Sequence, residues 1–177
     1  MSMRCLTQLS LTDFSFSHFR IFAMDYQLHE GSIALPDGFK DRTVNMFAFG
    51  DSVPAPLNIT ISRDDMPSTE DLSTYISRQV KLIANQLRGY TLTDKKPAIL
   101  STGQTVSGIQ VDAYYMHEGR PFYQRQAAFE IMPGRILVFS ATSQTDFSAS
   151  QDEDWLQLLA SFQPRLNDAE PTRTEQE

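Results

Sequence analysis

Apolar and polar residues alternate with a period of two along much of the chain, which is typical of half-buried β-strands. The strands that this pattern predicts cover residues 27–35, 42–49, 57–62, 105–116, 121–131 and 136–143. Turn-forming sequences follow several of them, namely Pro36-Asp37-Gly38, Glu118-Gly119 and Met132-Pro133-Gly134. We therefore expect an antiparallel sheet whose later strands form a meander.

Two segments have the three-to-four residue spacing of amphipathic helices instead. The first covers residues 68–88, with Ser68 as the expected N-cap and Gly89 as the expected stop. The second begins at Ser150 or Asp152 and places Trp155 on its apolar side. The fold class that follows is α+β, an antiparallel sheet packed by two helices.

Both ends of the chain differ from its centre. Residues 1–24 contain apolar side chains that polar ones interrupt throughout, so they lack the continuous core of an export signal, and we expect a poorly ordered extension. Residues 165–177 are acidic and contain one large apolar residue, which predicts a disordered tail. Between them, residues 25–164 are expected to form one domain.

Composition excludes several classes of function. The 177-residue chain has a net charge of −7, so it lacks the basic cluster that a nucleic-acid-binding protein needs. One cysteine and three widely spaced histidines exclude a disulfide framework and a multi-cysteine metal site. No nucleophile elbow, Walker loop, HExxH or CxxC motif is present, and two of the carboxylate clusters fall in first helical turns, where they complement the helix dipole. We expect no catalytic residue, no metal and no cofactor.

The register of the central hairpin follows if Glu118-Gly119 is a two-residue turn. Asp112 then lies opposite Arg125 as a cross-strand ion pair. One face is expected to carry Ile109, Val111, Ala113, Tyr115, Phe122, Gln124, Gln126 and Ala128, with Leu137, Phe139 and Ala141 added by the next strand. Both faces are too apolar for a sheet with one side in water. Either helices, loops or a second subunit cover both, or one face is a binding surface for an apolar partner.

Three segments carry a resemblance to a known family: LHEGSIALPDGFKDRTVNMF, ISRDDMP and GRPFYQRQAAF. They resemble the Eag chaperones of bacterial type VI secretion, which belong to the DcrB-like family, and in particular enterobacterial members that serve Rhs-type effectors. The resemblance covers about residues 26–165. It implies a homodimer with a PsbP-like fold and a concave apolar groove.

The resemblance also implies a function. Such a chaperone acts in the cytoplasm, binds the N-terminal region of a PAAR-containing effector and shields its transmembrane helices from water before loading on the secretion spike. It binds no nucleic acid and does not insert into the membrane. The alternative is a periplasmic DcrB-like assembly factor of the envelope without catalytic activity, against which the missing export signal counts.

The residues that match the family pattern give the expected effector-binding groove, which consists of Val44, Met46, Ile59, Ile61, Gln79, Phe122, Gln124 and Gln126. Gln79 interrupts the apolar stripe of the first helix, and a flank position in contact with water fits this pattern equally well. The face that carries Gln124 and Gln126 also fits a helix-covered core.

Overall fold

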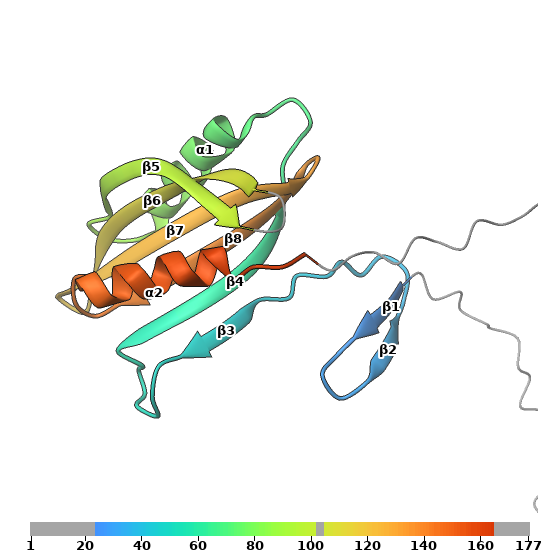
Figure 1. Ribbon diagram of the computed structural model, residues 1–177, viewed down its shortest axis with the longest axis horizontal. Coiled ribbons are helices and arrows are strands. Elements are labelled where there is room, and N and C mark those ends of the chain that lie inside the picture. The colour runs from blue at the N-terminus through green and yellow to red at the C-terminus, as the bar shows by residue number, and fades with distance from the viewer. Residues whose placement is uncertain (1–23, 102–104, 165–177) are drawn as a thin grey trace, which may run out of the picture. The chain divides into compact units, whose positions relative to one another are not determined.

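The computed structural model describes residues 24–101 and 105–164 (Figure 1). Except for Met24, the predicted N-terminal extension and the predicted C-terminal tail lie outside the described residues. The chain divides into two compact units, one ending at Asp41 and the other beginning at Arg42. The expectation of one domain over residues 25–164 stays a prediction.

The first unit contains an antiparallel hairpin of β1 (Met24–Gln27) and β2 (Ser32–Leu35). The sequence predicted a single strand over residues 27–35, and this is wrong. The chain reverses at Leu28–Gly31, where the Leu28 N–H donates to the Gly31 carbonyl oxygen at 2.6 Å. Three polar or glycine residues in a row interrupt the alternation there, and they form the turn.

The second unit is a six-stranded antiparallel sheet with two helices, which confirms the α+β class. Its strand order is β3-β4-β8-β7-β6-β5. The strands are β3 (Asn45–Ala48), β4 (Leu57–Asp65), β5 (Thr91–Ser101), β6 (Thr105–His117), β7 (Arg120–Met132) and β8 (Arg135–Ser143). The helices are α1 (Leu72–Gln86) and α2 (Ala149–Ala160).

Strand β5 was not predicted. Its sequence contains Lys95, Lys96 and Pro97, which are unusual in a strand, and a β-bulge between Leu92 and Asp94. These features are tolerated because β5 is an edge strand, which needs backbone hydrogen bonds along one side only.

Both helices begin at caps other than those expected. Asp71, not Ser68, is the N-cap of α1, and its carboxylate accepts a hydrogen bond from the Thr74 N–H at 2.7 Å. Ser148 is the N-cap of α2 and forms a capping box with Gln151. Helix α1 ends at the C-cap Leu87, whose N–H donates to the Ile83 carbonyl oxygen, and Gly89 follows two residues later with a φ of +66°.

Each face of the sheet packs against one helix, and Figure 1 shows α2 in front of the sheet and α1 behind it. We name the two sides the α1 face and the α2 face. The α1 face is packed through Tyr75, Ile76, Val111, Ala128 and Ile136, and the α2 face through Phe129, Phe139, Trp155 and Leu159 among others.

The register of β6 and β7 is as predicted, with a two-residue turn in which Glu118 and Gly119 have φ values of 50° and 79°. The predicted register of β8 is wrong by one residue. Leu137, Phe139 and Ala141 pack on the α2 face, whereas Ile136 and Val138 lie on the α1 face. A β-bulge between Glu130 and Met132 causes the difference, because one extra residue exchanges the two faces of the next strand.

Candidate binding face

The centre of the α1 face is polar but uncharged. Strands β4, β8 and β7 are neighbours, and we call their small polar residues on this side the polar floor: Asn58, Thr60, Ser62, Ser140, Thr142, Gln124 and Gln126. The residues lie in rows across the strands, since Thr60 pairs with Ser140 and Ser140 pairs with Gln126. Helix α1 contacts chiefly β6 and β7, so the part of the polar floor on β4 extends beyond the helix.

A cavity of about 340 Å³ lies between α1 and the polar floor, and we call it the helix cavity. Ile76, Gln79 and Ile83 line it from the helix, and Ser62, Gln126 and Val138 are among its residues from the sheet. One wall of the helix cavity is therefore mainly apolar and the other mainly polar.

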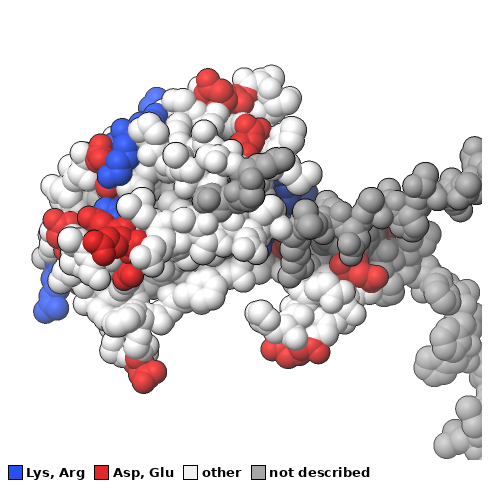
Figure 2. All heavy atoms as spheres, in the orientation of Figure 1, with Lys and Arg blue, Asp and Glu red and all other residues white. Residues whose placement is uncertain are grey.

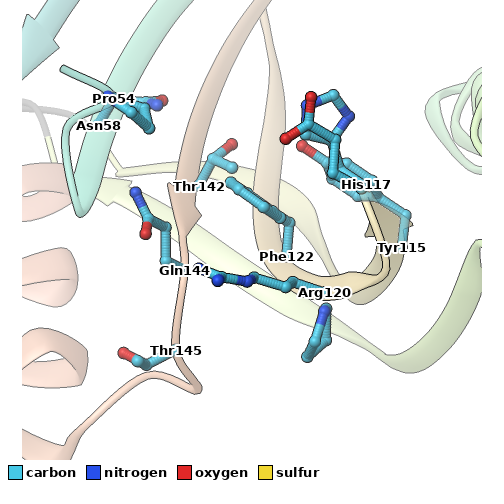
Figure 3. A pocket seen from close by; sticks show the side chains of 11 residues that line it. Pro54, Asn58, Tyr115, His117, Arg120, Phe122, Thr142, Gln144 and Thr145 are labelled. Carbon is cyan, nitrogen blue, oxygen red and sulfur yellow. The ribbon is translucent and has the colours of Figure 1, made fainter.

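A larger cavity of about 690 Å³ lies at the end of the β6–β7 hairpin, and we call it the hairpin cavity (Figure 3). Tyr115 and Phe122 stack there with ring centroids 5.8 Å apart, and His117 meets Phe122 edge-on at 5.5 Å. Figure 3 shows Arg120 reaching across from the hairpin toward Gln144. The same side of β7 thus runs from Phe122 in the hairpin cavity to Gln126 in the helix cavity.

Asp64 at the end of β4 supplies the one carboxylate that lines the helix cavity. Its Oδ2 accepts hydrogen bonds from the Tyr75 hydroxyl at 2.8 Å and from Gln79 Nε2 at 3.0 Å. Burial raises the pKa of Tyr75, and the hydrogen bond to the Asp64 carboxylate raises it further. Tyr75 therefore remains a neutral hydrogen-bond donor throughout the physiological pH range.

The opposite face is closed by α2 through buried polar contacts. Arg125 donates to Asp112 at 3.0 Å, which confirms the predicted ion pair, and to Asp152 of α2 at 2.7 Å. The indole N–H of Trp155 donates to Gln110 Oε1 at 2.9 Å. Acidic side chains gather over the first turns of α2 (Figure 2), so this side presents a charged surface.

Residues 24–101 and 105–164 contain no group of three or more His, Cys, Asp or Glu side chains placed to hold a metal ion. None of the helices in these ranges is long and apolar enough to cross a membrane.

A model of the DcrB family matches residues 30–161, which include both cavities. The chain belongs to the DcrB family. A protein of Pseudomonas aeruginosa named Effector EagT6 is 28% identical to this DcrB domain over 141 residues, which are 79% of this chain and 95% of the relative. The resemblance to the DcrB-like family and to an Eag protein is thereby confirmed.

A crystal structure of the P. aeruginosa protein of unknown function PA94 has the same fold as this DcrB domain. Its TM-score is 0.61 at 25% sequence identity, and the match covers 81% of this chain and 97% of that one.

The DcrB domain brings most of the predicted groove residues to the α1 face. Gln79 and Gln126 line the helix cavity together, and Phe122 lines the hairpin cavity. Gln124 lies between them on β7, and its Oε1 atom is buried without a hydrogen-bond partner among the described residues. Met46 pairs with Thr60 and is 69% exposed.

Val44, just before β3, is also exposed. Ile59 and Ile61 are different, because both pack against the core of the α2 face. The eight predicted residues therefore do not form one surface. Since side chains alternate along β4, the residues of this strand on the α1 face are Asn58, Thr60, Ser62 and Asp64.

Sequence reasoning missed Ser62, Asp64 and Tyr75 as lining residues of the helix cavity. The family resemblance pointed to Ile59 and Ile61 of β4, whereas the residues of this strand on the α1 face are polar. The pairing of Met46 with Thr60 shows which residues of β4 share a face with Met46, but this pairing is not visible in the sequence alone.

Proposed function

We propose that this DcrB-family protein is an effector-specific chaperone of a type VI secretion system. In this proposal it binds the N-terminal transmembrane helices of an Rhs-type effector with a PAAR domain, and shields them from water before the effector is loaded on the spike. The similarity to Effector EagT6 over 95% of that protein supports the effector system. The observation that carries the proposal is the helix cavity, which Gln79 and Gln126 line together. The exposed Met46 lies further along the same face of the sheet, on strand β3.

The chemistry of the α1 face suits an apolar helix. Exposed apolar surface costs about 25 cal/mol per Å², so covering roughly 300 Å² of a helix contributes about 7 kcal/mol. Met46, Val44 and Ile83 offer apolar contact at the margins. Hydroxyl and amide groups on the floor provide hydrogen bonds to the few polar groups of such a helix, at a far lower desolvation cost than charged groups would.

We further propose that the protein acts in the cytoplasm as a homodimer, without inserting into the membrane. Support for a second copy comes from the margin of the sheet at β3, where Phe47 of the strand is 56% exposed and Phe49, just after the strand, is 70% exposed. Such apolar side chains on an edge strand are typical of surfaces that a partner covers. The PsbP-like form of the fold and the absence of catalysis stay predictions.

Co-expression with the N-terminal, transmembrane-containing fragment of an Rhs-type effector from the same genome tests the proposal. We expect the fragment to become soluble and to co-elute with the chaperone from a detergent-free lysate. Gln79→Ala and Gln126→Ala should each reduce the co-eluting fraction, whereas Leu156→Ala on α2 should not.

A fragment that stays insoluble beside soluble, folded chaperone would refute the proposed function. Recovery of the native protein in the periplasmic fraction would favour the envelope assembly factor instead.

A further inference from the structure

Both oxygens of the Asp64 carboxylate accept hydrogen bonds. Oδ2 accepts from the Tyr75 hydroxyl and from Gln79 Nε2, and Oδ1 accepts from the backbone N–H of Asp65 at 2.9 Å. Arg42 and Arg63 also line the helix cavity, but neither forms an ion pair with Asp64 among the described residues. The Arg63 guanidinium donates to the Thr43 carbonyl and to Asn45 Oδ1. Asp64 therefore acts in the described structure as a hydrogen-bond acceptor and not as half of an ion pair.

The Tyr75 hydroxyl holds this carboxylate in place by its hydrogen bond. Its side chain is 2% exposed and packs in the core of the α1 face, and the Arg78 guanidinium lies over its ring at 5.3 Å. Arg78 is itself held by the Glu70 carboxylate at 2.8 Å. A buried, neutral tyrosine can only donate to a carboxylate, so its hydroxyl gives Asp64 one defined position.

This arrangement decides which end of the Gln79 amide faces the cavity. An ionised carboxylate accepts hydrogen bonds and donates none, so only the NH2 end of the amide can bond to Asp64. The carbonyl oxygen Oε1 of Gln79 therefore makes no hydrogen bond to Asp64. It accepts no hydrogen bond in the described ranges, where the one buried side-chain N or O atom without a partner is Gln124 Oε1. Gln79 Oε1 is therefore open to the helix cavity.

Gln126, on the opposite wall of the helix cavity, is not held by a comparable hydrogen bond. Its side-chain amide makes no hydrogen bond within the described part of the chain, and the residue is half-buried. Rotation of its amide can therefore present either a donor or an acceptor. The two glutamines of the cavity differ in this respect, although their side chains are identical.

We propose that Asp64 is a positioning residue that fixes Gln79 as a hydrogen-bond acceptor, so that the helix cavity selects a helix with a donor facing α1. The inference rests on the proposed function, and it adds a rule for selectivity. A bound helix with a hydroxyl group at that position gains one hydrogen bond, whereas an isosteric apolar residue leaves the oxygen unpaired.

Synthetic helices test the selectivity. The probes are fluorescent 20-residue leucine–alanine peptides with terminal lysines, which carry one Thr or the isosteric Val at each of seven successive central positions. At the best position, fluorescence anisotropy should show that wild-type protein binds the Thr peptide about five- to tenfold more tightly than the Val peptide, the worth of one neutral hydrogen bond.

In Asp64→Asn this ratio should fall to within about twofold, because the new amide can donate to Gln79 Oε1 and occupy it. Affinity for the Val peptide should change less than about twofold. Gln79→Ala should abolish the ratio as well, and adding Asp64→Asn to it should have no further effect. Gln126→Ala is the matched control and should keep the ratio. Thermal denaturation checks that each variant is folded, and Tyr75→Phe is a second variant that weakens the same anchor.

A spectrum of the free protein tests the orientation without any ligand. The Gln79 side-chain NH2 signals, assigned by their loss in Gln79→Ala, should include one downfield proton that exchanges slowly and returns to the ordinary position in Asp64→Asn.

The outcomes separate the two proposals. A wild-type ratio that persists in folded Asp64→Asn, an equal loss for both peptides, or unchanged Gln79 signals would overturn the positioning role alone. Wild-type protein that binds none of the peptides would overturn the proposed function and the selectivity with it.

Discussion

Replacing Met46 with aspartate should separate binding from stability. The side chain is 69% exposed, so only about a third of it leaves water on folding. Full burial of a methionine side chain is worth about 1.5–3 kcal/mol, which puts the loss in free energy of unfolding at roughly 0.5–1 kcal/mol. This is a small part of the roughly 5–15 kcal/mol that stabilises an ordinary domain.

The effect on binding should be much larger. If an apolar helix covers Met46, the new carboxylate loses its water without gaining a partner, which costs several kcal/mol. Each 1.4 kcal/mol is a factor of ten, so the affinity should fall at least about a hundredfold. Co-purification with the transmembrane fragment measures binding, and thermal denaturation of the free variant measures stability.

Leu156→Asp is the matched control. Leu156 is 64% exposed and lies on α2, so the same chemical change is made at similar exposure on the opposite face of the sheet. This variant should co-purify with the fragment as wild type does. Full co-purification of Met46→Asp, or equal losses in both variants, would refute the assignment of binding to the α1 face.

Three further predictions concern stability. Asp112→Asn should lower the free energy of unfolding by about 2–4 kcal/mol, and Asp152→Asn should lower it by under about 1 kcal/mol. Both carboxylates pair with buried Arg125, but Asp152 is half-exposed. Equal losses of the two variants in urea denaturation would contradict this. Gly108→Ala should cost more than about 3 kcal/mol, since its Cβ would overlap a buried ring and a backbone oxygen of β7, and a native-like melting temperature would disprove the overlap. The pKa of Tyr75 is higher in the folded protein than the value of about 10 expected in the unfolded chain. The contribution of this difference to the free energy of unfolding is fully present below about pH 10 and is lost as the pH rises further. Tyr75→Phe should therefore reduce the alkaline loss of stability, and an unchanged slope above about pH 10 would contradict the linkage.

The sequence was sufficient for the elements whose pattern is local. The hairpin at Glu118-Gly119 fixed the pairing of β6 with β7, including the contact between Asp112 and Arg125. The apolar spacing of α1 likewise identified the helix and its end near Gly89. In these places the residues that determine the structure lie within a few positions of one another.

The errors arose where distant parts of the chain decide the outcome. The β-bulge before Met132 exchanged the faces of β8, and no turn signal distinguishes a bulged hairpin from a regular one at this point. Strand β5, which contains Pro97, was not predicted at all, and its position at the edge of the sheet accepts this residue. Ile59 and Ile61 were assigned to the groove from the family resemblance, whereas the pairing of β4 with β8 places them on the α2 face.

The two edge strands of the six-stranded sheet differ in how well they can pair with a further strand. Strand β5 carries Lys95, Lys96, Pro97 and a bulge, which make it a poor template for another strand. Strand β3 carries none of these and exposes Met46 and Phe47. The sheet can therefore grow in one direction only. Two copies joined through β3 would present β5 at both outer margins, so that assembly would stop at two chains and would not continue into a fibre.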